Sequence, residues 1–212
     1  MAFIGKIIIW LGKVRWESLR YKLTGKRFGL LPHEWEHIEK LLLMDNYVIL
    51  TRRRAHLSTY MTNAAGLLVN GKWGYWSHVL MNIEDVQVGT RDDLKLYESI
   101  GLGVTSTPFD KVFDVDSVAL LKPKKAEGFT WDLVLKEARE DVEKKVPYDG
   151  NFNLLDETKM SCVEYVRHCL RQEWGYGYRF KNFERMVKKY KQITPDMYYD
   201  CGDFEIVYEI RK

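Results

Sequence analysis

The sequence feature that most constrains the fold is a helix start at Ser161. Ser161 is followed three residues later by Glu164, which is the pattern of a capping box. Apolar residues then recur at helical spacing: Val163, Val166 and Leu170. The pattern predicts an amphipathic helix whose first residue is Cys162 and whose apolar face packs against a core.

The position of Cys162 also suits nucleophilic chemistry. The unpaired backbone N–H groups at a helix start favour a thiolate over a thiol, and they can receive the negative oxygen of a tetrahedral intermediate. The alternative interpretation is that Cys162 is a small buried apolar residue, as many free cysteines are. Cys169 and Cys201 lack such a context and receive that interpretation. Three widely spaced cysteines do not form a disulfide framework, which indicates a reducing compartment or indifference to redox state.

His78 is the candidate base that would activate this thiol. A strand is expected over residues 77–84, so His78 lies near its beginning. Glu84 on the same strand is about 20 Å away at about 3.3 Å per residue, which is too far for a hydrogen bond. The next expected strand covers residues 94–100, and antiparallel pairing is expected to bring Glu98 opposite His78. Glu98 is therefore predicted to orient the imidazole ring.

Several short motifs follow one another along the chain in a specific order. They are Ser77-His78-Val79, Tyr97-Glu98-Ser99, Val118-Ala119-Leu120-Leu121-Lys122-Pro123, Pro147-Tyr148-Asp149, Ser161-Cys162-Val163-Glu164 and Ile193-Thr194-Pro195-Asp196-Met197. This order resembles the circularly permuted papain-like branch of the NlpC/P60 superfamily, the YiiX/YebB-like hydrolases. The resemblance covers residues 45–210 and places the histidine strand before the cysteine helix.

The resemblance implies an α+β fold, in which an antiparallel sheet packs against the helix that carries the cysteine nucleophile. It also implies a cysteine hydrolase that needs no metal and no cofactor. The family's catalytic roles fall on Cys162, His78 and Glu98 of this sequence. Four further residues are expected to contact the substrate: Tyr148, Asp149, Ser77 and Trp76.

Residues 1–44 are expected to form an N-terminal extension and residues 45–212 the hydrolase-like domain. Residues 1–27 carry seven basic residues and one acid beside an apolar stripe at helical spacing, which is typical of a basic amphipathic helix. This helix could lie on an anionic membrane surface, dock on a partner protein or pack on its own domain. It is too short and too charged to span a membrane and lacks the pattern of a signal peptide, so a cytoplasmic or virion-associated protein is expected.

A second motif, His33-Glu34-Trp35-Glu36-His37, matches a zinc-binding pattern of metalloproteases. Pro32 suits the first turn of a helix, and an apolar face follows, so the two histidines are expected on a short amphipathic helix. No third ligand follows at a familiar spacing, and zinc catalysis is not expected.

The remaining segments are expected to form scaffold. Strands are predicted over residues 115–121 and 204–210, and an amphipathic helix over residues 129–145. Residues 53–76 are interpreted as a long connection that shapes the substrate pocket.

Three functions are consistent with these features. The first is a peptidase or amidase that forms a thioester acyl-enzyme, acting on cell-wall peptides as much of the superfamily does. The second is a lipid acyl hydrolase or acyltransferase at a membrane surface, and the third is a non-catalytic structural module that keeps the fold. Nucleic acid is not an expected partner, because the net charge is only +3.

Overall fold

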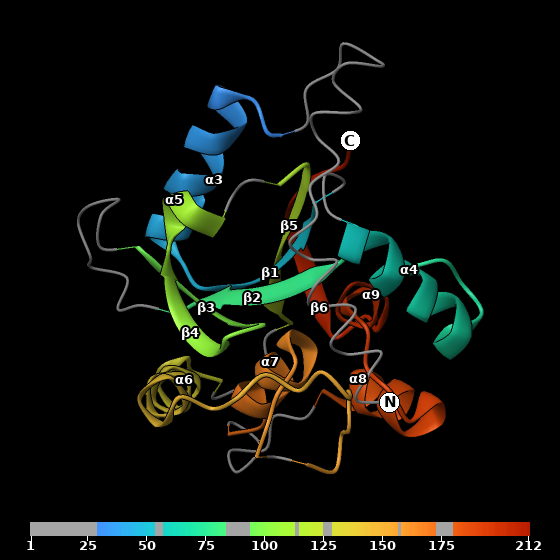
Figure 1. Ribbon diagram of the computed structural model, residues 1–212. Helices are drawn as coiled ribbons and strands as arrows, with labels where there is room; N and C mark the ends of the chain where they lie inside the picture. Colours follow the sequence, from blue (N-terminus) through green and yellow to red (C-terminus); the bar gives the residue numbers. More distant parts are fainter. Residues whose placement is uncertain are drawn as a thin grey trace.

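The computed structural model describes residues 29–53, 57–83, 94–112, 115–124, 129–156, 158–172 and 180–212. The basic helix expected over residues 1–27 lies outside these described residues. The described part is a mixed α+β structure built around one antiparallel sheet (Figure 1). The predicted α+β class and antiparallel sheet are thus confirmed.

The sheet has six strands in the order β4-β3-β2-β1-β5-β6, and each pairs antiparallel with its neighbours. The strands are β1 (Tyr47–Arg52), β2 (His78–Asn82), β3 (Lys95–Ile100), β4 (Gly103–Pro108), β5 (Ser117–Pro123) and β6 (Phe204–Ile210).

Helices cover both faces of this sheet. The described helices are α3 (Pro32–Met44), α4 (Leu57–Asn70), α5 (Phe109–Val112), α6 (Asp132–Lys144), α7 (Cys162–Arg171), α8 (Lys181–Tyr190) and α9 (Pro195–Asp200). In Figure 1, α3 and α5 lie above the sheet, and α6, α7 and α8 lie below it. The sheet is therefore the middle layer of three.

The buried strands explain why two cores form. On β1, Val48 and Leu50 belong to the core on the α7 side, whereas Tyr47 and Ile49 belong to the core on the α3 side. Successive side chains of a strand point to opposite faces, so a continuous apolar run is buried on both. The core on the α3 side includes Ile38 of α3. Helix α3 is thus part of the folded unit, although residues 1–44 were expected to form an extension.

Helix α4 occupies most of the segment that was interpreted as a long connection over residues 53–76. That interpretation is wrong, because Leu57–Asn70 is helical. The end of the segment is tied to this helix, since the backbone N–H of Gly74 donates to the carbonyl of Asn63 at 2.9 Å. Gly66 and Asn63 weaken the helical pattern in the sequence, but tertiary packing overrides such weak local preferences.

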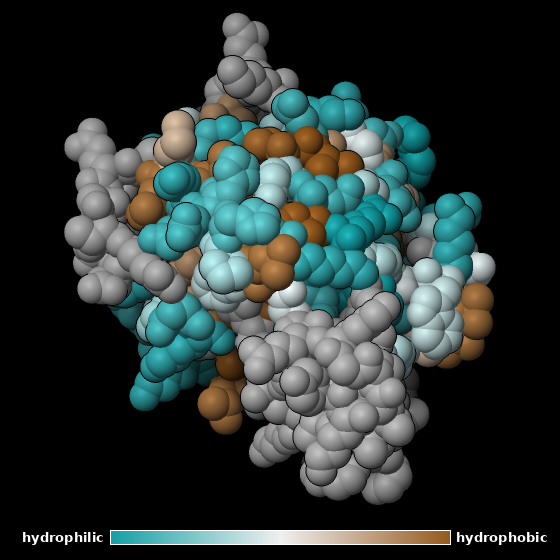
Figure 2. All heavy atoms as spheres, turned by 90° about the horizontal axis from the view of Figure 1, so that it is seen from above, coloured by the Kyte–Doolittle hydropathy of each residue, from teal (hydrophilic) through white to brown (hydrophobic). Residues whose placement is uncertain are grey.

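None of the described helices is both long and apolar enough to cross a membrane. Seen from above, hydrophobic side chains form separate patches among hydrophilic ones (Figure 2). The most exposed hydrophobic side chains of the described part, Leu68, Leu102 and Leu155, come from different segments of the chain.

The turn between β3 and β4 requires glycine. Gly103 has φ +109°, and a Cβ atom there would lie 2.5 Å from the carbonyl oxygen of Val146. The neighbouring Val104 N–H donates to the same oxygen at 2.8 Å. This contact joins the β3–β4 turn to the segment that follows α6.

We therefore expect Gly103→Ala to lower the free energy of unfolding by at least about 2 kcal/mol, since both the backbone conformation and a backbone contact oppose a side chain. Gly71→Ala is the matched control, because Gly71 has φ +74° but open space around it. The control should lose only about 1 kcal/mol. Urea denaturation measures both, and equal losses would contradict the role of the Val146 contact.

Candidate active site

Cys162 is the first residue of α7, as predicted. The N–H of Ser161 donates to Glu164 Oε2 at 2.8 Å, so the Glu164 half of the capping box holds the helix start. The residues around it are anchored as well: Met160 N–H donates to the carbonyl of Pro147 at 3.0 Å, and Tyr198 Oη donates to the carbonyl of Val163 at 2.7 Å. The thiol is therefore carried on a rigid element.

Cys162 differs from the other two cysteines in its surroundings. Cys162 is 9% exposed, and His78 and Tyr148 lie near its sulfur. Burial raises the pKa of the Cys169 thiol well above its usual value, and it raises the pKa of Cys201 to about 12. Those two thiols stay protonated and serve as core residues, in agreement with their interpretation from the sequence.

His78 is the first residue of β2 and lies between Glu98 and Cys162. Its Nε2 is 2.8 Å from Glu98 Oε2. The second carboxylate oxygen of Glu98, Oε1, accepts a hydrogen bond from Thr107 Oγ1 at 2.7 Å. Glu98 is only 5% exposed, so both of its oxygens are paired in a buried setting. The structure thus brings together the three residues that the sequence singled out.

The pairing of β2 with β3 differs from the prediction by two residues. Met81 pairs with Tyr97, and the same antiparallel register places His78 opposite Ile100. Glu98 is therefore diagonal to His78 and not directly opposite. The hydrogen bond still forms, because a shift of two residues keeps a side chain on the same face of the sheet.

The charge balance of the site favours an imidazolium. Burial lowers the pKa of His78, but the charge of Cys162 and hydrogen bonds with Cys162 and Glu98 raise it to about 10. Burial raises the pKa of Glu98, yet its hydrogen bonds to His78 and Thr107 hold it below the usual value. Because Glu98 engages Nε2, Nδ1 is the ring nitrogen left for the sulfur. The imidazolium is thus held between a buried carboxylate and the sulfur.

The chain that leads into His78 is held by Asp196, which belongs to one of the sequence motifs but was given no role there. Asp196 Oδ1 accepts hydrogen bonds from the N–H of Tyr75 at 2.7 Å and the N–H of Trp76 at 3.2 Å. A Cβ atom on Gly74 would lie 2.7 Å from Asp196 Oδ2 and 3.2 Å from Asn63 Cα, so a larger residue here would displace these neighbours. The Thr-Pro-Asp sequence at the start of α9 was the available signal.

Two of the four expected substrate contacts have mainly structural positions. Trp76 is fully buried in the core on the α7 side, so its ring has no surface for a substrate. Asp149 is buried and accepts the backbone N–H groups of Asn151 and Asn153, which shapes the loop after residue 149. The expectation for Asp149 came from the family resemblance, and the side chains of both residues turn inward.

The other two lie where they could contact a substrate. Ser77 is partly exposed beside His78, and its N–H donates to the carbonyl of Thr51 at 3.0 Å. Tyr148 is partly exposed, and burial and the nearby charges of Cys162 and Glu164 raise its pKa. The Tyr148 phenol is thus a neutral hydrogen-bond donor near the sulfur.

The zinc-like motif lies on α3, outside the site of Cys162. His33 and His37 are exposed on this helix, and the ring of His37 lies 4.7 Å from that of Tyr208. Glu34 Oε2 accepts hydrogen bonds from Leu31 N–H and from Lys212 Nζ, both at 2.6 Å. Glu34 thus caps the start of α3 and also contacts Lys212.

Comparisons with models of protein families, with curated proteins and with solved structures find no match to this chain.

The pKa of His78 provides a direct test of the geometry. We expect the imidazole to stay protonated well above pH 6.5, and its pKa to fall in Cys162→Ala, because the charge of the sulfur is then removed. Since the pKa in the folded state is raised, the stabilisation from this ion pair is complete below pH 6.5 and is lost as pH rises toward 10. NMR titration of the His78 ring measures this pKa. Cys201→Ala is the control and should leave it unchanged.

The hydrogen bond from Thr107 provides a second test. Thr107→Val keeps the shape but removes a donor to the buried Glu98, so we expect a loss of about 1–3 kcal/mol in unfolding free energy at neutral pH. The pKa of Glu98 should rise, so the stability difference between variant and wild type should shrink as pH falls below 4.5. Thr105→Val on the same strand is the control. Urea denaturation at several pH values distinguishes the two variants, and identical curves would refute the role of Thr107.

Proposed function

We propose that the protein is a cysteine hydrolase with a permuted papain-like arrangement, which cleaves an amide bond through a thioester acyl-enzyme. The observation that carries the proposal is the position of His78, which hydrogen-bonds buried Glu98 on one side and Cys162 at the start of α7 on the other. A nucleophile, a base and an orienting carboxylate are the parts that such chemistry needs. The order of the sequence motifs supports the same assignment.

In the proposed reaction, the Cys162 thiolate attacks the carbonyl carbon of the substrate. The negative oxygen that develops would be received by the N–H of Cys162 at the helix start, with the Tyr148 phenol as a second donor. His78 gives its proton to the leaving amine as the C–N bond breaks, which leaves a thioester on Cys162. His78 then removes a proton from water, the hydroxide attacks the thioester, and the carboxylic acid product and the thiolate are released.

The buried Glu98 would act on His78 and not on the substrate. It holds the ring in one orientation and stabilises the imidazolium before the proton is transferred. Thr107 holds Glu98 in turn. These three groups come from three adjacent strands, β2, β3 and β4, so the sheet itself sets their geometry.

A test that does not depend on the substrate is the rate of alkylation by iodoacetamide at pH 6. We expect rapid labelling of Cys162, and labelling slower by at least about tenfold in His78→Asn, because the thiolate then loses its cationic partner. Cys169→Ala and Cys201→Ala are controls and should label like the wild type. Mass spectrometry of the peptide that contains Cys162 gives the rates.

Equal labelling of wild type and His78→Asn would reject the ion pair and favour a non-catalytic module. Once the ion pair is established, hydrolysis of peptide amides is measured with Cys162→Ala as the inactive reference. The expected loss is several orders of magnitude, because Cys162 provides the covalent step.

A lipid acyl substrate is the second candidate, and the charge of residues 1–27 favours it. Seven basic residues against one acid would attract an anionic membrane surface. Sedimentation with anionic and neutral vesicles, for the full chain and for a variant with residues 1–27 removed, tests this point. Hydrolysis of ester lipids in anionic vesicles, lost in Cys162→Ala, would favour the lipid substrate over the peptide.

A further inference from the structure

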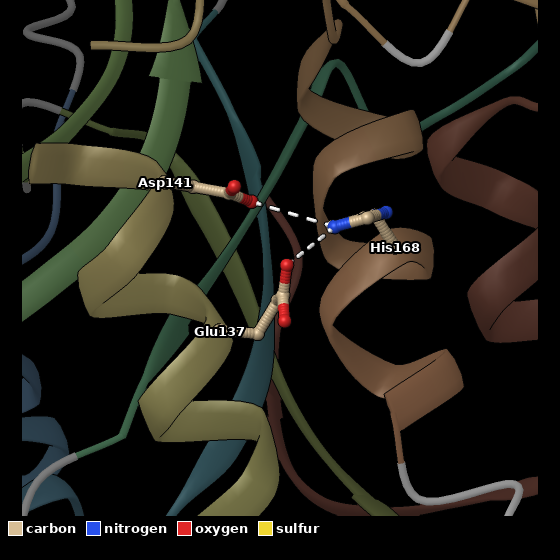
Figure 3. Close-up of side chains that lie close together, drawn as sticks. All are labelled: Glu137, Asp141 and His168. Atoms are coloured by element: carbon tan, nitrogen blue, oxygen red, sulfur yellow. Dashed lines mark hydrogen bonds and ion pairs between the residues drawn. The ribbon is translucent and has the colours of Figure 1, made fainter. Parts of the chain in front are cut away.

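A second cluster of metal-ligating side chains lies between α6 and α7, away from the group around Cys162. Glu137 and Asp141 are four residues apart on α6, so they share one face of the helix. Both side chains point toward His168 in the last turn of α7 (Figure 3). His168 is six residues after Cys162, or about 9 Å along the helix axis, so the two clusters occupy opposite ends of α7.

The distances in this cluster suit a small divalent cation. His168 Nε2 lies 2.9 Å from Glu137 Oε1 and 3.7 Å from Asp141 Oδ2. The three ligand atoms all lie within 4.8 Å of one another. When zinc binds its ligands tetrahedrally at about 2.0–2.1 Å, neighbouring ligand atoms are about 3.3 Å apart. The two distances from His168 Nε2 lie on either side of this value. An ion could therefore enter with small movements of these side chains.

The buried oxygen of Asp141 is the independent observation that points to a ligand. Asp141 is only 3% exposed, and its Oδ2 has no hydrogen-bond partner among the described residues. This oxygen is directed at His168 and lies within ion-pair distance of it, but it is too far from it for a hydrogen bond. A buried carboxylate oxygen without a hydrogen bond is costly, and a bound cation would remove that cost. Burial also raises the pKa of Asp141, although the charge of His168 opposes this effect.

The other two ligands leave the site open to solvent. The side chains of Glu137 and His168 are each 22% exposed, and His168 borders a small surface hollow together with Asn153 and Arg167. One imidazole and two carboxylates are a ligand set that zinc accepts, with the remaining position taken by water.

We propose that Glu137, Asp141 and His168 form a binding site for a divalent transition metal ion such as Zn²⁺, which ties α6 to the helix that carries Cys162. In this site His168 binds through neutral Nε2, and each carboxylate provides one oxygen. The ion takes the place of the direct contacts between His168 and the two acids. Its role is to hold the end of α7 in place, and it takes no part in the proposed hydrolysis.

The test is Zn²⁺ binding to the full chain in a Cys162→Ala background. This background removes the accessible thiol of Cys162, which could bind zinc on its own. We expect one Zn²⁺ per chain by isothermal titration calorimetry, and a Tm that rises with Zn²⁺ concentration. Asp141→Asn and Glu137→Gln should each weaken binding by at least about tenfold. Glu143→Gln, an exposed acid on the same helix, is the control and should change the affinity by less than about twofold.

Cobalt(II) gives an independent readout of the same ligands. With Cys162 replaced, we expect visible d–d bands without the near-ultraviolet absorption of a thiolate ligand, and their loss in Asp141→Asn. Zn²⁺ binding only when Cys162 is present, or equal binding by Asp141→Asn and Glu143→Gln, would overturn the proposal and leave His168 as an ion-pair partner of the two acids. Glu137, whose side chain is 22% exposed, keeps the test decisive if Asp141→Asn does not fold. Alkylation of Cys162 is measured separately, so each proposal can fail alone.

Discussion

The packing of α7 against β2 and β3 is the constraint on which the site depends. Six of the ten residues of α7 are buried, and its start is fixed by hydrogen bonds to the backbone of Ser161 and Val163. A rotation of this helix by one residue would turn its side chains by about 100° and move the sulfur away from His78. The apolar face of α7 therefore packs in the core and, by fixing the rotation of the helix, also orients the Cys162 thiol toward His78.

The polar residues of the site form one chain from Thr107 through Glu98 and His78 to Cys162. A buried carboxylate without partners would be strongly destabilising, and breaking a buried pair costs about 3–5 kcal/mol. The hydrogen bonds from Thr107 and His78 offset the cost of burying Glu98. The carboxylate in turn orients His78 and favours its charged form. The interactions that stabilise this region and those that would activate the thiol are thus the same.

Predictions based on local patterns agreed with the structure, and those based on register or on weak patterns did not. The helix start at Cys162 follows from a capping box and an apolar stripe within ten residues. The partnership of His78 and Glu98 was expected, but the pairing differs by two residues because the connection between β2 and β3 is too long for a turn type to set it. Trp76 was expected in the substrate pocket, although its large apolar ring is stabilised by full burial.

Short-range interactions control the start of α7, the strand β5 and the choice of thiol, imidazole and carboxylate, so these features could be predicted from the sequence. The groups that support them from other parts of the chain depend on the tertiary structure. Thr107 reaches Glu98 because β3 and β4 pair, and Asp196 reaches the chain before His78 from 120 residues away. The cluster of Glu137, Asp141 and His168 likewise exists only because α6 packs on α7. Local patterns do not encode such contacts, because they depend on how apolar faces distant in the chain pack together.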